Sequence, residues 1–337
     1  GNRCLSSASG LSLSSERGDA DLRSFERGIA ACPPPRVSPL PGEGPGVRLF
    51  ITIIIMKRLI LLCGLVLAAT VGLQAKTKAE KAGWKTGMQS YTFHMFSLQE
   101  ALDKCQELGV KYIEVYPGHK LGEGYGDLAF GPDLDAATLK RVRQEASRRG
   151  VRIVGAGVYT SDNLDDWTRF FQMAKAMKLE YVTCEPNPDQ WDHVEALSRK
   201  YGIKVAVHNH PRPSTYWNPD ALMQLIQHRA KGIGSCADIG HWRRQGLDEM
   251  QCLRRVGDRL ITFHFKDIAP KHDGEAEQTD VIWGTGCLSL RQILTHLRDM
   301  KWKGYLSVEY EANWLNSVPD IRKSLQYFDT LSEEVLR

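Results

Sequence analysis

Residues 260–266 read Leu-Ile-Thr-Phe-His-Phe-Lys, and residues 304–310 read Gly-Tyr-Leu-Ser-Val-Glu-Tyr. Each is a short, largely apolar run that ends in ionisable side chains, and amphipathic sequence separates the two. The same alternation of apolar runs and amphipathic segments extends back to about residue 85. Such an alternation is typical of a parallel sheet whose strands are joined by helices.

The apolar runs predict eight strands, at 86–92, 111–116, 151–158, 180–185, 203–209, 234–239, 260–266 and 304–310. The intervening helices have recognisable starts, such as the Ser97–Glu100 capping box and the Asn218-Pro219 pair. Eight strand–helix units favour a closed barrel over an open doubly wound sheet, and no Gly-x-Gly-x-x-Gly follows the first strand. Because about 250 residues are typical of such a barrel, we predict a single-domain (β/α)8 TIM barrel of the α/β class over 86–337.

The segment that precedes this domain has the pattern of a signal peptide. Met56 is followed by a basic pair and then by the apolar run 59–73. That run is about 15 residues long, shorter than the ~20 that a membrane helix needs. We therefore predict a signal peptide over 56–75, and the less favoured alternative is a short membrane anchor.

Three further expectations follow for the ends of the chain. Residues 1–55 are rich in Gly, Ser, Pro and Arg and lack hydrophobic periodicity, so we interpret them as disordered, non-native upstream translation. Residues 76–85 are expected to be a linker. The mature protein is expected to be periplasmic or secreted, with no stable membrane span.

The cysteines and the net charge say little about what the protein binds. The expected mature chain has five cysteines without any Cys-x-x-Cys spacing, so we predict free, buried thiols rather than a disulfide framework. The net charge of +4 includes the arginine-rich leader and does not indicate a nucleic-acid partner. A homo-oligomer is possible.

Ionisable side chains gather at the predicted strand ends. In a barrel of this kind the active site lies at the carboxyl ends of the strands, and alternate side chains point inward. The inward candidates from strands four to eight are Glu185, His208, His210, Asp238, His264, Lys266, Glu309 and Glu311. Glu114 on strand two also has inward parity, and we interpret it as a pocket-wall or salt-bridge residue.

Carboxylates and imidazoles packed this closely cost several kcal/mol unless a partner compensates them. One divalent cation could do so, and the mixed donors suit Mn²⁺, Co²⁺, Fe²⁺, Mg²⁺ or Zn²⁺. Lys266 is either a counter-charge to the carboxylates or a substrate contact. Aromatic side chains in the loops after the strands suit stacking on a sugar, or are ordinary packing residues: His94, Trp217, Trp242 and Trp283.

Four short motifs resemble those of the xylose isomerase-like TIM barrels, especially the sugar phosphate isomerase/epimerase group: Asp238-Ile-Gly-His241, His264-Phe-Lys-Asp267, Trp283-Gly-Thr-Gly286 and Val308-Glu309-Tyr310. The resemblance covers about 85–330. It implies that Asp238, His264 and Glu309 are metal ligands and that His241 contacts substrate.

Strand five departs from the family pattern. Relatives commonly carry Glu-Asn-His there, whereas this chain has His208-Asn209-His210. The fourth metal ligand is therefore either His208 or Glu185 reaching in from strand four. The missing carboxylate also weakens a mechanism in which two glutamates pass a proton across one carbon.

These residues predict a metal-dependent sugar isomerase or epimerase that removes a proton next to a carbonyl and passes through a metal-bound enediolate. The candidate catalytic residues are Glu185, Glu309, His241 and Lys266. The candidate substrate-binding residues are His210, His241, Lys266, Trp217 and Trp283.

Two alternatives remain at this stage. A lyase that splits 3-keto-glycosides by β-elimination would use the same intermediate, and export together with the strand-five substitution favours it somewhat. A non-catalytic sugar-binding barrel would keep the loop aromatics but need no metal. An abasic-site endonuclease of similar fold would need more metal ions, more histidine ligands and a basic groove. In either enzymatic case the expected partner is a small carbohydrate.

Overall fold

The computed structural model describes residues 76–272, 274 and 278–337. The segment 1–55 and the predicted signal peptide 56–75 lie outside the described residues. Within those residues no helix has the length and apolar character that a membrane span requires. The expected linker 76–85 differs from what is observed, because it contains a short helix, α2 (Lys78–Ala82), and the start of the first strand at Trp84.

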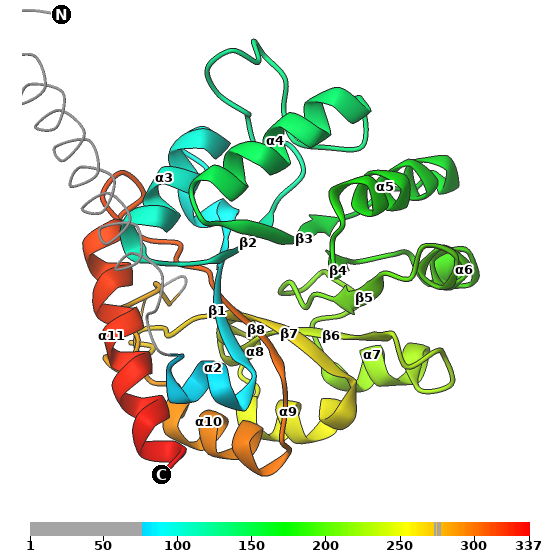
Figure 1. The fold of residues 1–337 in the computed structure, drawn as a ribbon. Helices are drawn as coiled ribbons and strands as arrows, with labels where there is room; N and C mark the ends of the chain where they lie inside the picture. Colours follow the sequence, from blue (N-terminus) through cyan, green and yellow to red (C-terminus); the bar gives the residue numbers. More distant parts are fainter. Residues whose placement is uncertain (1–75, 273, 275–277) are drawn as a thin grey trace, which may run out of the picture. The chain divides into compact units, whose positions relative to one another are not determined.

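Eight parallel strands close into a barrel in chain order, and the first strand pairs with the last (Figure 1). The strands are β1 (Trp84–Gln89), β2 (Tyr112–Val115), β3 (Arg152–Tyr159), β4 (Tyr181–Cys184), β5 (Lys204–Val207), β6 (Ile233–Asp238), β7 (Leu260–Phe265) and β8 (Gly304–Val308). The prediction of a single (β/α)8 barrel is confirmed.

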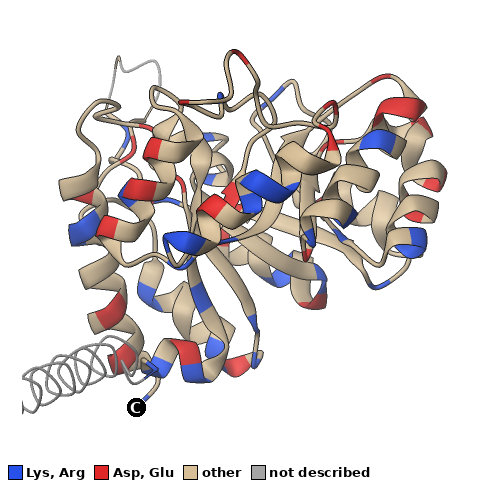
Figure 2. Ribbon diagram, turned by 45° about the horizontal axis from the view of Figure 1, so that its top comes forward, with Lys and Arg blue, Asp and Glu red and all other residues tan. Residues whose placement is uncertain are grey.

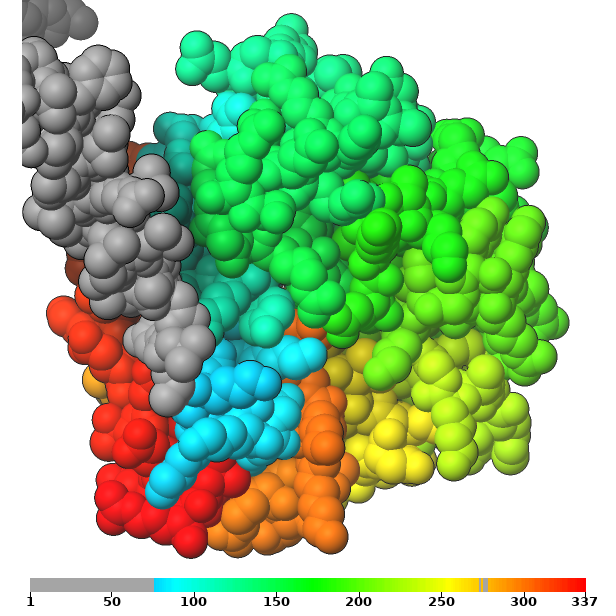
Figure 3. Space-filling model, in the orientation of Figure 1, coloured from blue at the N-terminus to red at the C-terminus, as the bar shows by residue number. Residues whose placement is uncertain are grey.

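Helices surround the barrel and cover the outer face of the strands (Figure 1). The main ones are α3 (Leu98–Leu108), α4 (Ala136–Arg148), α5 (Leu164–Met177), α6 (Trp191–Tyr201), α7 (Pro219–Ile226), α8 (Ile239–Arg244), α9 (Glu249–Val256), α10 (Leu290–Asp299) and α11 (Val318–Val335). Short 3-10 turns are η1 (Ser90–Phe93), η2 (Pro188–Gln190) and η3 (Gly257–Arg259). The first segments of the barrel lie against the last ones, as the neighbouring cyan, orange and red surfaces in Figure 3 show.

Local sequence signals explain where the helices begin. Ser97 and Glu100 form the predicted capping box on α3, in which each side chain accepts a hydrogen bond from the other's backbone N–H. Asn218 caps α7, and Pro219 occupies its first turn. These predicted starts are confirmed. Acidic and basic residues alternate along the helices that surround the barrel in the ribbon of Figure 2.

Two apolar layers hold the fold together. The larger lies between strands and helices and includes the fully buried rings of Trp167, Trp191 and Trp242. The smaller lies inside the barrel and consists of Val154, Tyr181, Ala206, Cys236 and Tyr305. The side chains of this layer fill the inside of the barrel, which is therefore a packed core and not a pore.

The five cysteines of the described residues are all free, and four are buried. The predicted absence of a disulfide framework is therefore confirmed for this part of the chain. Burial raises the pKa of Cys105 and Cys236, the latter to about 12, so these thiols are protonated at neutral pH.

Close approach of β6 and β7 gives a test of the barrel packing. A Cβ atom on Gly234 would lie 1.9 Å from the carbonyl oxygen of Arg259, a backbone atom that cannot move aside freely. We expect Gly234→Ala to lower the free energy of unfolding by about 1–3 kcal/mol, the usual cost of overpacking.

The matched control is Gly232→Ala, two residues earlier, where the nearest atom to a Cβ is the Ser198 hydroxyl at 3.9 Å. Urea unfolding followed by circular dichroism measures both variants. Equal stability of the two would contradict the packing described for β6 and β7.

Candidate metal centre and active site

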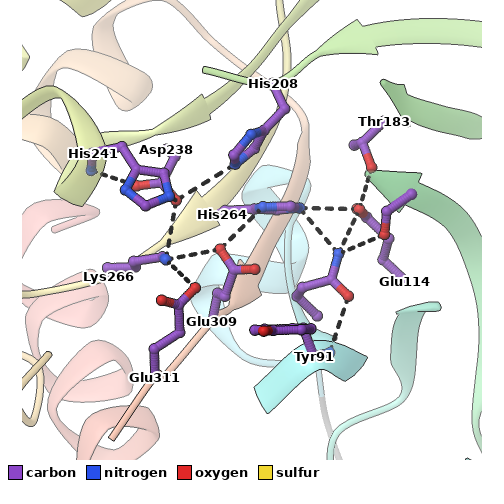
Figure 4. Close-up of polar contacts among 12 residues, drawn as sticks. Tyr91, Glu114, Thr183, His208, Asp238, His241, His264, Lys266, Glu309 and Glu311 are labelled. Carbon is purple, nitrogen blue, oxygen red and sulfur yellow. Dashed lines mark hydrogen bonds and ion pairs between the residues drawn. The ribbon is translucent and has the colours of Figure 1, made fainter. Parts of the chain in front are cut away.

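Four donor side chains converge at the carboxyl ends of neighbouring strands (Figure 4). His208 follows β5, Asp238 ends β6, His264 lies in β7 and Glu309 follows β8. One ligand atom from each lies within 4.8 Å of the ligand atoms of the other three, and all four residues are buried. The four therefore form one compact cluster, to which we refer as the donor cluster.

Each member of the donor cluster has one buried atom that makes no hydrogen bond: His208 Nε2, Asp238 Oδ2, His264 Nδ1 and Glu309 Oε2. These atoms approach one another as ion-pair contacts, with His208 Nε2 3.6 Å from Asp238 Oδ2 and His264 Nδ1 3.2 Å from Glu309 Oε2. A buried polar atom without a hydrogen bond costs about 1–3 kcal/mol.

A divalent cation removes that cost, because two imidazoles and two carboxylates are donors that such ions accept together. The residues present thus fit a metal ion.

His264 is held in one orientation by a buried carboxylate behind it. Its Nε2 atom lies 3.0 Å from Glu114 Oε1, and Glu114 also accepts hydrogen bonds from Gln89 and Thr183. The hydrogen bond to Glu114 assigns the ring proton to Nε2 and leaves the Nδ1 lone pair directed at the donor cluster. A carboxylate that orients a metal-binding histidine in this way is a common feature of metal sites. The predicted pocket-wall or salt-bridge residue Glu114 therefore pairs with a member of the donor cluster.

Glu185 orients the His208 ring in the same way. Its Oε1 atom lies 3.2 Å from His208 Nδ1, so the opposite nitrogen, Nε2, is left for the donor cluster. The same carboxylate accepts hydrogen bonds from the backbone N–H and Nδ1 of His210, at 2.9 and 2.7 Å, and from the Ser214 hydroxyl. Burial alone would raise the pKa of Glu185, but the two histidines lower it, so the carboxylate is ionised.

The sequence left His208 and Glu185 as alternatives for the fourth position. The geometry brings His208 into the donor cluster and places Glu185 behind it. The prediction that Glu185 is a direct metal ligand is therefore not supported, because its oxygens are engaged by His208, His210 and Ser214.

Asp238 is fixed by backbone hydrogen bonds on both sides. Its Oδ1 atom accepts the backbone N–H of His241 at 2.7 Å and so caps α8. The Asn209 side chain donates to the Asp238 carbonyl and accepts its N–H, both at 2.9 Å. Because Oδ1 is used by the helix cap, Oδ2 is the oxygen that faces the donor cluster.

Lys266 is a buried counter-charge. Its ammonium lies 3.3 Å from Asp238 Oδ2, 3.1 Å from Glu309 Oε2 and 2.8 Å from Glu311 Oε1. Burial opposes its charge, but Asp238 and Glu309 raise its pKa well above the ordinary value. Three carboxylates around one ammonium leave negative charge that the two imidazoles or a divalent cation can offset, and neighbouring groups raise the pKa of His208 and His264 in spite of their burial. Of the two roles open for Lys266, the geometry favours the counter-charge.

A cavity of about 400 Å³ opens beside the donor cluster, a size within the range of small-molecule sites. It is lined by Gln89, Tyr91, Tyr116, Pro117, Gly157, Val158, His208, His210, His241, Glu309 and Glu311. The predicted substrate-binding residues His210 and His241 thus reach it. Burial lowers the pKa of His241 well below the ordinary value, so its imidazole is neutral.

Neither of the two tryptophans that the sequence predicted to bind substrate lines this cavity. Trp283 is only 2% exposed and packs on Phe265 and Phe328, because Asp267 accepts the backbone N–H groups of the following glycines and turns the indole inward. Trp217 does not line the cavity and instead stacks under the Arg212 guanidinium at 3.7 Å. Lys266 also does not line the cavity.

Several cavity residues were not singled out from the sequence. Tyr91 lies in the η1 turn after β1, and Tyr116 follows β2. Gln89, the last residue of β1, bonds to Glu114. Strand parity on β1 and β2 could have indicated Gln89, as it did Glu114, but no pattern marks an aromatic side chain in a turn.

The closed barrel and the donor cluster together define a (β/α)8 barrel equipped to hold a divalent cation. A family model described as xylose isomerase-like TIM barrel matches residues 102–331, and the chain belongs to that family. The predicted resemblance is confirmed.

Known relatives extend over most of the barrel. Fructoselysine 3-epimerase of Escherichia coli O157:H7 is 25% identical over 285 residues, covering 74% of this chain and 99% of the relative. A solved structure of an uncharacterised protein from Parabacteroides distasonis is 32% identical, with a TM-score of 0.61 and coverage of 74% and 99%.

A xylose isomerase-like TIM barrel protein from Mycobacterium smegmatis, solved in complex with magnesium, has a TM-score of 0.61. It is 14% identical and covers 78% of this chain and all of its own, a likeness that shows the fold.

Glu114, the carboxylate behind His264, allows a test of how that histidine is oriented. In Glu114→Gln the amide can donate to His264 Nε2 and favour the tautomer that puts a proton on Nδ1, where a cation would bind. We expect the affinity for Mn²⁺ to fall about 10- to 100-fold, measured by titration calorimetry of metal-stripped protein.

The matched control is Glu107→Gln, an exposed residue that pairs with Arg322, which should bind Mn²⁺ as the unaltered protein does. Undiminished affinity in a folded Glu114→Gln variant would rule out the proposed orienting role.

Proposed function

We propose that this protein is a divalent-metal-dependent enzyme that removes a proton from the carbon next to the carbonyl group of a sugar. The observation that carries the proposal is the set of four buried atoms without hydrogen bonds, beside a cavity of about 400 Å³. The name of the epimerase relative and the magnesium in a barrel of the same fold support it.

When bound, the metal would withdraw charge from a carbonyl oxygen and so make the adjacent C–H more acidic. His208, Asp238, His264 and Glu309 would hold it. Glu309 also lines the cavity and is the candidate base. Burial by itself would raise the pKa of Glu309, but His264 and Lys266 lower it, so the carboxylate is ionised, the form that a base must have before it takes a proton.

The two carboxylates that line the cavity, Glu309 and Glu311, both follow β8. The imidazoles of His208, His210 and His241 come from the segments after β5 and β6. A proton removed by Glu309 could return to the neighbouring carbon in an isomerisation, or to the opposite face of the same carbon from an imidazole in an epimerisation. We therefore propose isomerase or epimerase activity first.

Elimination is the second candidate, and the replacement of the family's strand-five glutamate by His208 favours it. Loss of a substituent from the carbon next to the carbanion needs only one base. The carboxylates on the β8 side of the cavity are therefore sufficient for elimination. A 3-keto-glycoside would then be split by β-elimination, with the C2 proton taken by Glu309 and the C1 substituent leaving. Export of the mature protein to the periplasm or medium remains a prediction, as does homo-oligomerisation.

The metal and the proton transfer can be measured together. Purified residues 76–337 should contain about one divalent ion per chain by elemental analysis. In ²H₂O they should introduce deuterium next to the carbonyl of ketoses or of 3-keto-glucosides, as seen by NMR. A protein that holds no metal and exchanges neither class of compound would instead be a sugar-binding barrel.

Replacement of the candidate base gives a sharper result. We expect Glu309→Gln to lower the exchange rate by at least about 100-fold, the usual share of a general base, because an amide cannot accept the proton. Metal content is measured in the same sample to separate loss of the base from loss of the ion.

Glu334→Gln makes the same chemical change at an exposed residue that pairs with Arg291, and should leave exchange unaltered. If the folded Glu309→Gln variant exchanged at the unaltered rate, Glu309 would not be the base.

A further inference from the structure

A cluster of aromatic side chains borders the cavity on the side of β1 and β8. Tyr91 stacks on His94 with ring centroids 4.7 Å apart, and Trp314 meets the His94 ring edge-on at 4.4 Å. Trp314 also contacts Tyr91 edge-on at 6.1 Å. Because β1 and β8 pair in the closed barrel, the loops that follow them are neighbours, and the three rings form one surface, which we call the aromatic rim.

The aromatic rim is continuous with the wall of the cavity. Tyr91 and Tyr116 both line the cavity, and their rings meet edge-on with centroids 5.4 Å apart. In Figure 4 the Tyr91 ring lies on the Glu309 side of the donor cluster. A group bound next to Glu309 can therefore extend from Tyr91 onto Trp314 without leaving aromatic surface.

The outer end of the aromatic rim is flanked by exposed apolar side chains. Met95, in the loop after β1, is 56% exposed, and Leu315, in the loop after β8, is 71% exposed. Among the described residues, Tyr91 of the rim is itself 41% exposed, and the remaining large apolar side chains that are exposed are Leu128 and Leu164, on other segments. Exposed apolar surface gathered at the mouth of a pocket is a feature of ligand grooves and interfaces.

The aromatic rim exceeds what a sugar alone requires. A sugar ring offers one apolar face and many hydroxyl groups, and the donor cluster with His210, His241 and Glu311 already supplies polar partners for it. His94 Nδ1 bonds to the Tyr91 carbonyl and the Asn313 amide bonds to the Asn316 carbonyl, so the rim presents mainly ring faces, with the Tyr91 hydroxyl, the Trp314 N–H and His94 Nε2 as its polar groups. The outer rim therefore suits an apolar group.

We propose that the substrate is a keto-sugar that carries an apolar, preferably aromatic, substituent, and that the aromatic rim binds that substituent while the sugar lies at the donor cluster. This inference rests on the proposed function and specifies its substrate class. The occupant is argued to be part of the substrate, since the rim is continuous with the cavity through Tyr91. Aromatic rings in offset or edge-on contact stabilise one another beyond the area that they bury.

Two substrates that differ only in the substituent test the proposal: 4-nitrophenyl and methyl 3-keto-β-glucoside, each incubated with metal-loaded protein in ²H₂O. The rate of C2 proton exchange or elimination gives kcat/KM for each. We expect the aryl compound to be favoured about tenfold or more. Trp314→Ala should reduce this preference to about one by slowing the aryl compound more than the methyl compound.

The matched control is Leu128→Ala, which removes an exposed apolar side chain outside the rim and should preserve the aryl preference. Equal rates for both substrates, or an aryl preference that survives Trp314→Ala, would overturn this inference while leaving the proposed function in place.

If neither glycoside reacts, the ketose exchange described above decides the proposed function, and calorimetric binding of the two glycosides decides the inference separately. A dimer that sedimentation detects in the unaltered protein and not in Trp314→Ala would show that a second copy covers the rim, and would likewise overturn it.

Discussion

The burial of like charges at one end of the barrel is the constraint on which the site depends. Asp238 and Glu309 are buried, and their oxygens are close enough to bind the same ion. The single positive charge of Lys266 cannot by itself neutralise both of them and Glu311. Charges removed from water cost several kcal/mol each unless they are paired. Such a cluster persists in a folded protein when a cation completes it, and the four atoms without hydrogen bonds mark where that cation belongs.

The rest of the architecture serves to hold those atoms in place. Glu114 and Glu185, which are not members of the donor cluster, each bond to one of its two histidines. They leave the opposite ring nitrogens, Nδ1 of His264 and Nε2 of His208, for the donor cluster. A helix cap fixes Asp238 in the same manner. The packed interior layer beneath these residues keeps the strand ends from moving relative to one another.

Much of the fold and part of the site could be predicted from the sequence, because period-2 alternation indicates which side chains face inward. That reasoning brought Asp238, His264 and Glu309 together correctly. It could not decide between His208 and Glu185, since both have inward parity, and only the hydrogen bonds around Glu185 show that it stands behind His208. The sequence predicted that Trp283 contacts substrate. No sequence pattern indicates that Asp267 bonds to the backbone of the loop that carries Trp283 and that the indole is buried.

His208 stands on strand five where the family pattern is expected to have a glutamate, and this difference alters the chemistry available to the site. Carboxylates face the cavity from the β8 side and imidazoles from the β5 and β6 side, so the two sides are chemically unequal. That asymmetry is what makes one-base elimination a serious rival to epimerisation. The aromatic rim lies on the carboxylate side, next to the candidate base, where a substituent on the sugar would extend.

We expect one divalent cation to bind to four specific atoms, and anomalous diffraction from a crystal grown with Mn²⁺ can locate it. The expected result is a single strong peak within bonding distance of His208 Nε2, Asp238 Oδ2, His264 Nδ1 and Glu309 Oε2, with Glu185 still bonded to His208. A peak bound by Glu185 in place of His208, or no peak at the strand ends, would contradict it.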